Sequence, residues 1–384
     1  MTDMVTARSL LDRLVAFRSV SRDSNLELID WVAEWLEGQG ITVTKVPDPA
    51  QPTKASLFAQ VGPDVAEGVV LSGHTDVVPV EGQDWASDPW AVVERDGRLY
   101  GRGVCDMKGF DALALAAMAA AARRPLKRPL QIALSHDEEL GCIGCIPMIE
   151  AMAGLPRASA VVVGEPTMMK AVTGHKGGLA FWVKVHGHEV HSSLMHTGVS
   201  AILEGAKILM WVNEMNAKGQ AAAKASPFVP PWTTVHTGEI RGGTAHNITA
   251  GLCEFGVDFR VLPGEDPEDW RRAFLAKVAE VEVGMKAVHP NARIEVKERF
   301  ALPGLAPEVD GVAEGLVRAL TGDNGSQVVS YGTEAGQFQV RGWSAVVCGP
   351  GDIEQAHKAD EWLALSQFEA GWAFMEDLIE RLCA

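Results

Sequence analysis

Residues 68–76 read GVVLSGHTD, a short apolar run that ends in polar side chains capable of chemistry. Such runs alternate with helical segments at 26–37 and 111–122, a pattern typical of buried parallel strands in an α/β sheet. Three more runs also lead toward polar residues: 130–134 toward Asp137–Glu139, 160–163 toward Glu165, and 344–348 toward His357. Because ligand sites in such sheets lie beyond the carboxyl ends of the strands, we expect these polar groups to share one site.

The middle of the chain has a different pattern. It predicts a strand-helix-strand-strand-helix-strand order, with elements at 181–186, 199–216, 233–240, 250–261, 267–285 and 293–297. This order predicts an inserted ferredoxin-like α+β domain with an antiparallel sheet. The predicted fold class is therefore α/β, with a mixed, mainly parallel sheet flanked by helices. The domains are expected at 1–177 plus 296–384 for the catalytic part and at 178–295 for the insertion.

Composition limits the kinds of partner. The chain has 384 residues, 47% of them hydrophobic, which is enough for a large core in two domains. Its net charge of −16 comes from acidic residues spread along the chain, which argues against nucleic acid. The N-terminus is interrupted by charges and does not resemble a signal peptide, so a cytoplasmic location is expected. The longest apolar run, 112–122, is too short to cross a membrane and predicts a buried helix.

The six cysteines do not form a pattern typical of a disulfide framework. Cys142 and Cys145 have the C-x-x-C spacing. A zinc knuckle would need a second such pair, and a redox pair would need a thioredoxin-like setting. The preferred interpretation is that both are small residues packed at the start of a helix.

His74 and Asp76 are the first candidates for a metal site. They are two residues apart at a predicted strand end, so their side chains face the same side. Asp76 can then hold one imidazole nitrogen of His74 while the other binds metal. Asp106 follows in the glycine-punctuated loop GRGVCDMKG, where close backbone approach is possible.

The segment SHDEELG at 135–141 places three consecutive carboxylates directly after a buried strand. Concentrated negative charge there requires a positive partner. Glu165 and His357 complete a set of two imidazoles and several carboxylates, which suits zinc, cobalt or manganese. Taken singly, a His-x-Asp pair, an acidic helix start and a Glu-Pro turn are common without function, but their convergence on one sheet edge favours a metal site.

The sequence resembles the two-zinc metallopeptidases of the aminoacylase and carboxypeptidase type. The matching stretches are SGHTDVVPV at 72–80, GRGVCDMKGF at 101–110, SHDEELG at 135–141, VVGEPT at 162–167 and GPGDIEQAHKADE at 349–361. Further matches indicate the acetylornithine deacetylase branch, namely SRDSNLELIDWV at 21–32, DFRVLPGED at 258–266 and GTEA at 332–335.

This resemblance implies a role for each candidate in the metal site. It implies that Asp106 bridges two divalent ions, most simply zinc, with His74 and Glu165 on one ion and Glu139 and His357 on the other. Glu138 is similar to the family's general base, and Asp76 would orient His74. The peptide bond after Asp106 is expected to be cis.

The resemblance also implies substrate contacts. His191, in Val-His-Ser-Ser, is similar to a histidine that reaches the active site from the partner subunit as an oxyanion donor, so a homodimer through the inserted domain is expected. Val190 stands where the family usually has glycine, and His188 and His196 are alternatives nearby. Three further residues are candidate contacts for a substrate carboxylate: Arg260, Asn247 and Lys176. For Arg260 the alternative is a surface ion pair.

The expected substrate is a small N-acyl amino acid. Glu334 is a hypothetical partner for the side-chain ammonium of ornithine, on charge complementarity. The implied activity is hydrolysis of N2-acetyl-L-ornithine to L-ornithine and acetate in arginine biosynthesis. Alternatives are a succinyl-diaminopimelate desuccinylase, an aminoacylase or a dipeptidase with the same metal core, or a metal-dependent binding protein without catalysis.

Overall fold

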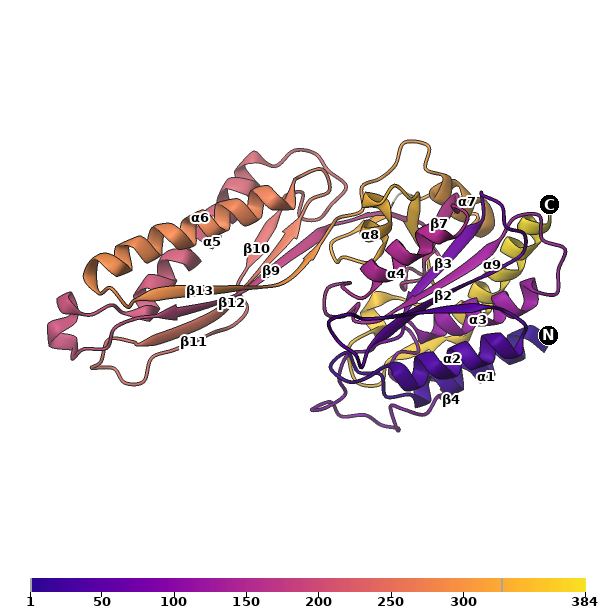
Figure 1. Cartoon of the computed structure of the whole chain (residues 1–384), viewed down its shortest axis with the longest axis horizontal. Coiled ribbons are helices and arrows are strands. Elements are labelled where there is room, and N and C mark those ends of the chain that lie inside the picture. The colour runs from indigo at the N-terminus through magenta and orange to yellow at the C-terminus, as the bar shows by residue number, and fades with distance from the viewer. Residues whose placement is uncertain (1, 326) are drawn as a thin grey trace. The chain divides into compact units, whose positions relative to one another are not determined.

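The computed structural model describes residues 2–325 and 327–384 and contains two compact units, which we describe separately (Figure 1). The first runs to Gly174 and continues over Leu305–Val328 and Thr333–Ala384. The second comprises His175–Gly304 and Val329–Gly332. It extends beyond the expected range of 178–295, because its last long strand continues to Leu302, five residues beyond the strand end predicted at 297.

The first unit is built on an eight-stranded sheet. Its strands are, in spatial order, β1 (Val43–Pro47), β2 (Ala55–Val61), β6 (Leu130–Ser135), β3 (Val69–His74), β7 (Ala160–Val163), β15 (Ala345–Val347), β8 (Val172–His175) and β14 (Gln327–Val329). Strands β6, β3, β7 and β15 are parallel, whereas β1, β2 and β8 pair antiparallel with their neighbours. The prediction of a mixed, mainly parallel sheet is confirmed.

Helices flank this sheet and explain why its central strands are mostly apolar and buried along their whole length. Every residue of β3, β6 and β7 is buried, as expected for strands covered on both faces. The helices are α1 (Thr2–Ala16), α2 (Leu26–Gly38), α3 (Lys108–Ala121), α4 (Cys145–Ala151), α7 (Val312–Thr321), α8 (Ala335–Val340) and α9 (Leu365–Cys383). Helix α3 packs against α1 and α9 and is buried almost completely, so the apolar run at 112–122 is a core helix, as predicted.

A three-stranded sheet in the first unit was not predicted. It contains β4 (Val93–Arg95), β5 (Arg98–Tyr100) and β16 (Trp362–Ala364), in the order β16-β5-β4. Two short 3-10 turns, η1 (Met152–Gly154) and η3 (Ile353–Gln355), complete this unit. The pairing of β5 with β16 brings the segment before Asp106 beside the segment after His357, which matters for the site described below.

The second unit is an antiparallel sheet covered by two long helices. The sheet has the order β10 (Thr234–His236), β12 (Leu252–Val261), β9 (Gly177–His186) and β13 (Arg293–Leu302), and β11 (Ile240–Gly242) also pairs with β12. The helices are α5 (Ala201–Ala222) and α6 (Pro267–Val288), and a 3-10 turn, η2, covers Ser192–Thr197. Helix α6 begins where Asp266 accepts a hydrogen bond from the Glu268 N–H. The α+β prediction is confirmed, although the strand expected at 233–240 covers only Thr234–His236 and a second short strand begins at Ile240.

The helices of the described residues include none that is long and apolar enough to cross a bilayer.

Candidate metal centre

Three adjacent parallel strands end at the candidate site. His74 is the last residue of β3, Glu138 and Glu139 follow β6, and Glu165 follows β7. Because β6, β3 and β7 are neighbours and run parallel, these side chains emerge at the same sheet edge. The residue before Glu165 must be glycine, since a Cβ at Gly164 would lie 2.0 Å from the Phe110 ring.

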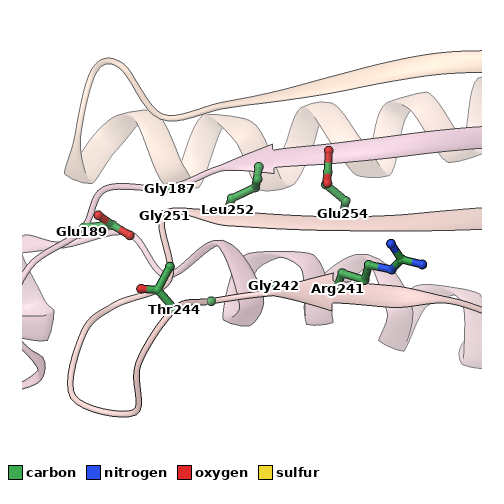
Figure 2. A pocket seen from close by; sticks show the side chains of 9 residues that line it. Gly187, Glu189, Arg241, Gly242, Thr244, Gly251, Leu252 and Glu254 are labelled. Atoms are coloured by element: carbon green, nitrogen blue, oxygen red, sulfur yellow. The ribbon is translucent and has the colours of Figure 1, made fainter.

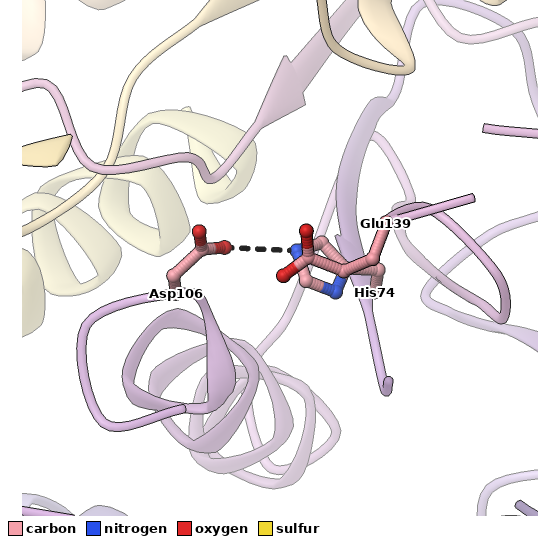
Figure 3. Close-up of side chains that lie close together, drawn as sticks. All are labelled: His74, Asp106 and Glu139. Atoms are coloured by element: carbon pink, nitrogen blue, oxygen red, sulfur yellow. Dashed lines mark hydrogen bonds and ion pairs between the residues drawn. The ribbon is translucent and has the colours of Figure 1, made fainter. Parts of the chain in front are cut away.

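Asp106 lies between two imidazoles. Its Oδ1 is 3.0 Å from His74 Nε2 (Figure 3), and its Oδ2 is 3.1 Å from His357 Nε2. His357 Nε2 is also 3.0 Å from Glu139 Oε1, and His74 Nε2 is 3.7 Å from Glu165 Oε1. One carboxylate thus faces a separate histidine with each of its oxygens, and each histidine has a second carboxylate beside it.

The donor atoms form two overlapping groups. Ligand atoms of His74, Asp106 and Glu139 lie within 4.8 Å of one another, and so do those of His74, Glu138 and Glu165. Nitrogen and carboxylate oxygen donors at this spacing fit divalent transition metals. The residues therefore fit a centre for divalent cations.

The electrostatics of the cluster support the same interpretation. Burial raises the pKa of Glu165 well above its ordinary value, and Asp106 and Glu138 add to this rise. Burial also raises the pKa of Glu138 to about 8, against the opposing charge of His74 and with help from Glu139. For His357, hydrogen bonds to Asp106 and Glu139 raise the pKa to about 10. Carboxylates that cannot all ionise together need added positive charge, which bound cations supply.

The orientation of His74 is set from its own strand end. Its Nδ1 lies 2.9 Å from the main-chain oxygen of Asp76, which can only accept, so Nδ1 carries a hydrogen and Nε2 faces Asp106. The Asp76 carboxylate is farther away, with Oδ1 at 3.6 Å from Nδ1. The hydrogen bond that orients His74 therefore comes from the main-chain carbonyl of Asp76, and the predicted contact from its carboxylate is longer than a hydrogen bond.

The Asp76 carboxylate also holds the acidic loop that follows β6. It accepts hydrogen bonds from the backbone N–H of Glu138 at 3.1 Å and of Glu139 at 3.4 Å, and from Ser21 Oγ at 2.7 Å. Its position therefore links the loop after β3 to the loop that carries two of the site carboxylates.

Asp106 is placed by Glu361, a residue to which no role was assigned from the sequence. The buried Glu361 carboxylate accepts from the backbone N–H groups of Gly103, Cys105 and Asp106 at 2.9–3.1 Å, and pairs with Arg102 at 2.7 Å. The peptide bond between Asp106 and Met107 is cis, as the resemblance implies. Glu361 is the last residue of the motif GPGDIEQAHKADE, and membership of this motif is the sequence feature that could have indicated a role for it.

Asp137, the first carboxylate of the acidic run, points to a lysine. The Lys54 ammonium lies 2.8 Å from Asp137 Oδ1 and donates to the Ser21 carbonyl at 2.5 Å. Both side chains of the pair are buried, and Gln51 donates to the other Asp137 oxygen at 3.1 Å. Part of the positive charge expected beside SHDEELG therefore comes from Lys54.

Glu334 is not placed as a free carboxylate. It is 1% exposed, Ser72 donates to Oε2 at 3.2 Å, and Ser135 donates to Oε1. Both oxygens are used by buried hydroxyls, which argues against the hypothesis that Glu334 pairs with a substrate ammonium. The local sequence around Glu334 does not indicate that it contacts Ser72 of β3 and Ser135 of β6.

The remaining predicted substrate contacts belong to the second unit. Lys176 is buried, and its ammonium donates to the Pro230 and Trp232 carbonyls at 2.8 Å each, which leaves it poorly suited to a substrate carboxylate. Arg260 Nε lies 3.0 Å from Asp258 Oδ2, so the alternative of an ion pair is the arrangement observed.

His191 and Asn247 lie on neighbouring segments of the second unit. His191 pairs with Ile248 in an isolated bridge, and the Ser192 N–H donates to the Asn247 carbonyl at 2.8 Å. His191 is exposed, and its Nδ1 lies 2.8 Å from Ser193 Oγ, which leaves Nε2 for another contact. His188, one of the two alternatives, instead stacks on His289 with ring centroids 3.7 Å apart.

A cavity of about 550 Å³ also lies in the second unit (Figure 2). Glycines make up much of its lining, together with Glu189, Arg241 and Glu254. None of the predicted substrate contacts lines it, and it has no imidazole for acid-base chemistry.

Cys142 and Cys145 pack at the start of α4, as expected, and both are buried. The structure adds a contact that the sequence did not indicate. Cys142 Sγ donates a hydrogen bond to Glu138 Oε1 at 2.9 Å.

Comparison with known proteins identifies the architecture. The peptidase family M20/M25/M40 matches residues 70–381. The chain is 34% identical to an acetylornithine deacetylase of Myxococcus xanthus over 100% of this chain and 99% of the relative, and 33% identical to one of Proteus mirabilis over 97% and 96%. Among solved structures, an M20 family metallo-carboxypeptidase of Sulfolobus solfataricus superposes with a TM-score of 0.79 at 16% identity, over 98% of this chain and 99% of that one. This chain therefore belongs to the peptidase family M20/M25/M40 and is a hydrolase.

Proposed function

We propose that this enzyme hydrolyses the amide bond of N2-acetyl-L-ornithine and releases acetate and L-ornithine. The observation that carries the proposal is the placement of Asp106 between His74 and His357, with Glu138, Glu139 and Glu165 around them. The full-length likeness to acetylornithine deacetylases supports the choice of substrate.

Two divalent cations would occupy this centre, with zinc the first choice and cobalt or manganese as alternatives. His74 and Glu165 would hold one, Glu139 and His357 the other, and Asp106 would contribute one oxygen to each. Cations bound there would polarise the amide carbonyl and lower the pKa of water toward neutrality. The crowded carboxylates around Asp106 support this assignment, because positive charge is what allows them to ionise together.

Glu138 would move the proton. Its backbone N–H is held by Asp76 and one of its oxygens by Cys142, so its carboxylate is fixed beside the cluster. It would accept a proton from the attacking water, which adds to the carbonyl carbon. When the C–N bond breaks, Glu138 would deliver that proton to the leaving amine nitrogen, so the base is restored at the end of the cycle.

The second unit would supply the substrate contacts and the dimer interface. His191 is proposed as a donor to the developing oxyanion, and Asn247 and Arg260 as contacts to the substrate carboxylate. Arg260 would exchange Asp258 for that carboxylate. We further propose that the enzyme forms a homodimer through this unit, and that it acts in the cytoplasm in arginine biosynthesis.

The test is the rate of free-amine release from N2-acetyl-L-ornithine by zinc- or cobalt-loaded protein. N-succinyl-diaminopimelate, other N-acetyl amino acids and dipeptides are run beside it. The proposal expects chelator-sensitive turnover of acetylornithine well above that of the others. Turnover of another N-acyl amino acid with none of acetylornithine would reject the substrate and keep the two-cation centre, while absence of turnover on every compound would reject both.

A further inference from the structure

The Cys142 thiol is held against the acid-base carboxylate by a tight turn. Residue Cys142 follows Glu138 by four positions, and its backbone N–H donates to the Glu138 carbonyl at 2.8 Å. The backbone of Cys142 is left-handed, with φ of 56°. This turn places Sγ 2.9 Å from Glu138 Oε1, in a position where Cys142 is 1% exposed.

The hydrogen bond runs from sulfur to oxygen. A thiol has an ordinary pKa near 8.5, so it is protonated at neutral pH. Burial raises the pKa of the Cys142 thiol well above that value, and the negative charge of Glu138 adds to the rise. Sγ therefore carries the hydrogen and donates it to Glu138 Oε1.

We propose that Cys142 is a positioning residue for the Glu138 carboxylate, an inference that rests on the proposed hydrolysis. The thiol is hydrogen-bonded to Glu138 Oε1. A rotation of the Glu138 carboxylate that turned Oε2 away from the reacting water would break this hydrogen bond. The backbone N–H of Glu138 donates a hydrogen bond to Asp76 Oδ1, with 3.1 Å between nitrogen and oxygen. Glu138 is thus anchored at its main chain and at the tip of its side chain by two different segments.

Cys145 offers a matched control. It is also fully buried and lies three positions farther along, but its thiol donates to the main-chain oxygen of Cys142 at 3.1 Å rather than to an acid. Substitutions at Cys145 therefore reproduce the loss of a buried thiol without touching the Glu138 side chain.

The kinetic test compares Ala and Ser at both positions, with metal content and melting temperature measured for each variant. Cys142→Ala should lower kcat about tenfold with little change in KM or bound metal, the loss expected for one hydrogen bond to a charged group. Cys142→Ser retains a donor and should keep most of kcat. Both Cys145 variants should keep kcat even where they lower the melting temperature.

A packing role predicts the opposite order at Cys142, because alanine suits an apolar environment better than a hydroxyl does. If Cys142→Ala keeps kcat while Cys142→Ser loses it, or if kcat follows the melting temperature across all four variants, the inference is overturned. If the wild-type enzyme hydrolyses a different N-acyl amino acid, the same four variants are compared on that substrate and the inference stands or falls as before. If the wild-type protein is inactive on every N-acyl compound, both the proposed function and this inference are overturned.

A spectroscopic test does not depend on turnover. The infrared S–H stretching band of Cys142 is isolated by subtracting the spectrum of Cys142→Ala, or of Cys142→Ser should the first variant fail to fold. In the metal-loaded protein, where the cations would keep Glu138 ionised, Glu138→Gln replaces a charged acceptor by a neutral one, which weakens the hydrogen bond and should move this band to higher frequency. The inference fails if Glu138→Gln leaves the band where it was.

Discussion

The carboxylate of Asp76 accepts a hydrogen bond from the backbone N–H of Glu138 at 3.1 Å. The two residues lie beyond the ends of adjacent parallel strands, β3 and β6. Because Asp76 also sets the direction of His74 through its own carbonyl, one residue positions both an imidazole donor and the acid-base loop.

Replacement of Asp76 should affect the metal and the rate together. Asp76→Ala removes the acceptor for Glu138 and Glu139, and we expect metal affinity and kcat each to fall about 10- to 100-fold. Asp76→Asn retains one acceptor oxygen and should lose less. Ser21→Ala, which removes only the hydroxyl donor to Asp76, is the matched control. Metal titration and kcat on the same preparations check this, and an Asp76→Ala protein with unchanged affinity would contradict it.

Replacement of Glu138 should separate chemistry from metal binding. Glu138→Gln keeps the size and polarity of the side chain but cannot accept the proton of the attacking water. We expect kcat to fall about 10²- to 10⁴-fold, with bound metal unchanged. Steady-state kinetics and metal analysis measure both quantities. A loss below tenfold would remove Glu138 from the role of base.

Removal of metal should abolish activity and lower stability. A chelator should stop turnover, and zinc or cobalt should restore it. Free metal at a thousandfold excess over its dissociation constant should raise the free energy of unfolding by about 4 kcal/mol, since only the folded chain brings these ligands together. Thermal melts with and without metal check this. His357→Ala should show a smaller rise, and an equal rise would place the ion elsewhere.

Glu334 should make the stability of the metal-free protein depend on pH. Burial raises the pKa of Glu334 to about 7, although its hydrogen bonds from Ser135 and Ser72 oppose the rise. The Glu334 carboxyl group therefore binds its proton more tightly in the folded chain than in the unfolded chain. The resulting stability is complete below the ordinary glutamate pKa near 4.3 and is lost as pH rises toward 7.

Glu334→Gln removes this dependence. Relative to wild type, the variant should gain about 2–3 kcal/mol in free energy of unfolding between pH 5 and pH 8. Urea unfolding of chelator-treated protein at both pH values measures the difference. Glu376→Gln, at an exposed position of α9, should show no such gain. A constant difference between wild type and Glu334→Gln at the two pH values would contradict the prediction.

The buried ion pair between Lys54 and Asp137 should be important for stability. Lys54→Met leaves the Asp137 carboxylate buried without its cation and should lower the free energy of unfolding by about 3–5 kcal/mol. Lys45→Met breaks an exposed pair with Asp30 and should change it little. Urea denaturation of both variants makes the comparison. Equal changes in the free energy of unfolding for the two variants would contradict the prediction that the buried pair contributes more to stability than the exposed one.

The sequence alone determined the central parallel strands of the large sheet, the core helix and the residues at those strand ends. A parallel strand buried on both faces is mostly apolar, so GVVLS, LQIAL and AVVV could be recognised without knowledge of their neighbours. The polar residues after these runs then had to meet, because parallel strands in one sheet share the edge at which they end. His74, Glu138 and Glu165 were therefore predictable as one cluster.

Only the tertiary structure decided which distant groups hold that cluster in place. Glu361 reaches the backbone of Asp106 across 255 positions, and Lys54 reaches Asp137 across 83. Glu334 was expected to meet substrate but is buried between Ser72 and Ser135. Periodicity in hydropathy reports only whether a local segment is buried, and it carries no information about which remote side chain satisfies a buried charge. That choice depends on how the strands and loops pack, and it becomes visible only when the chain is folded.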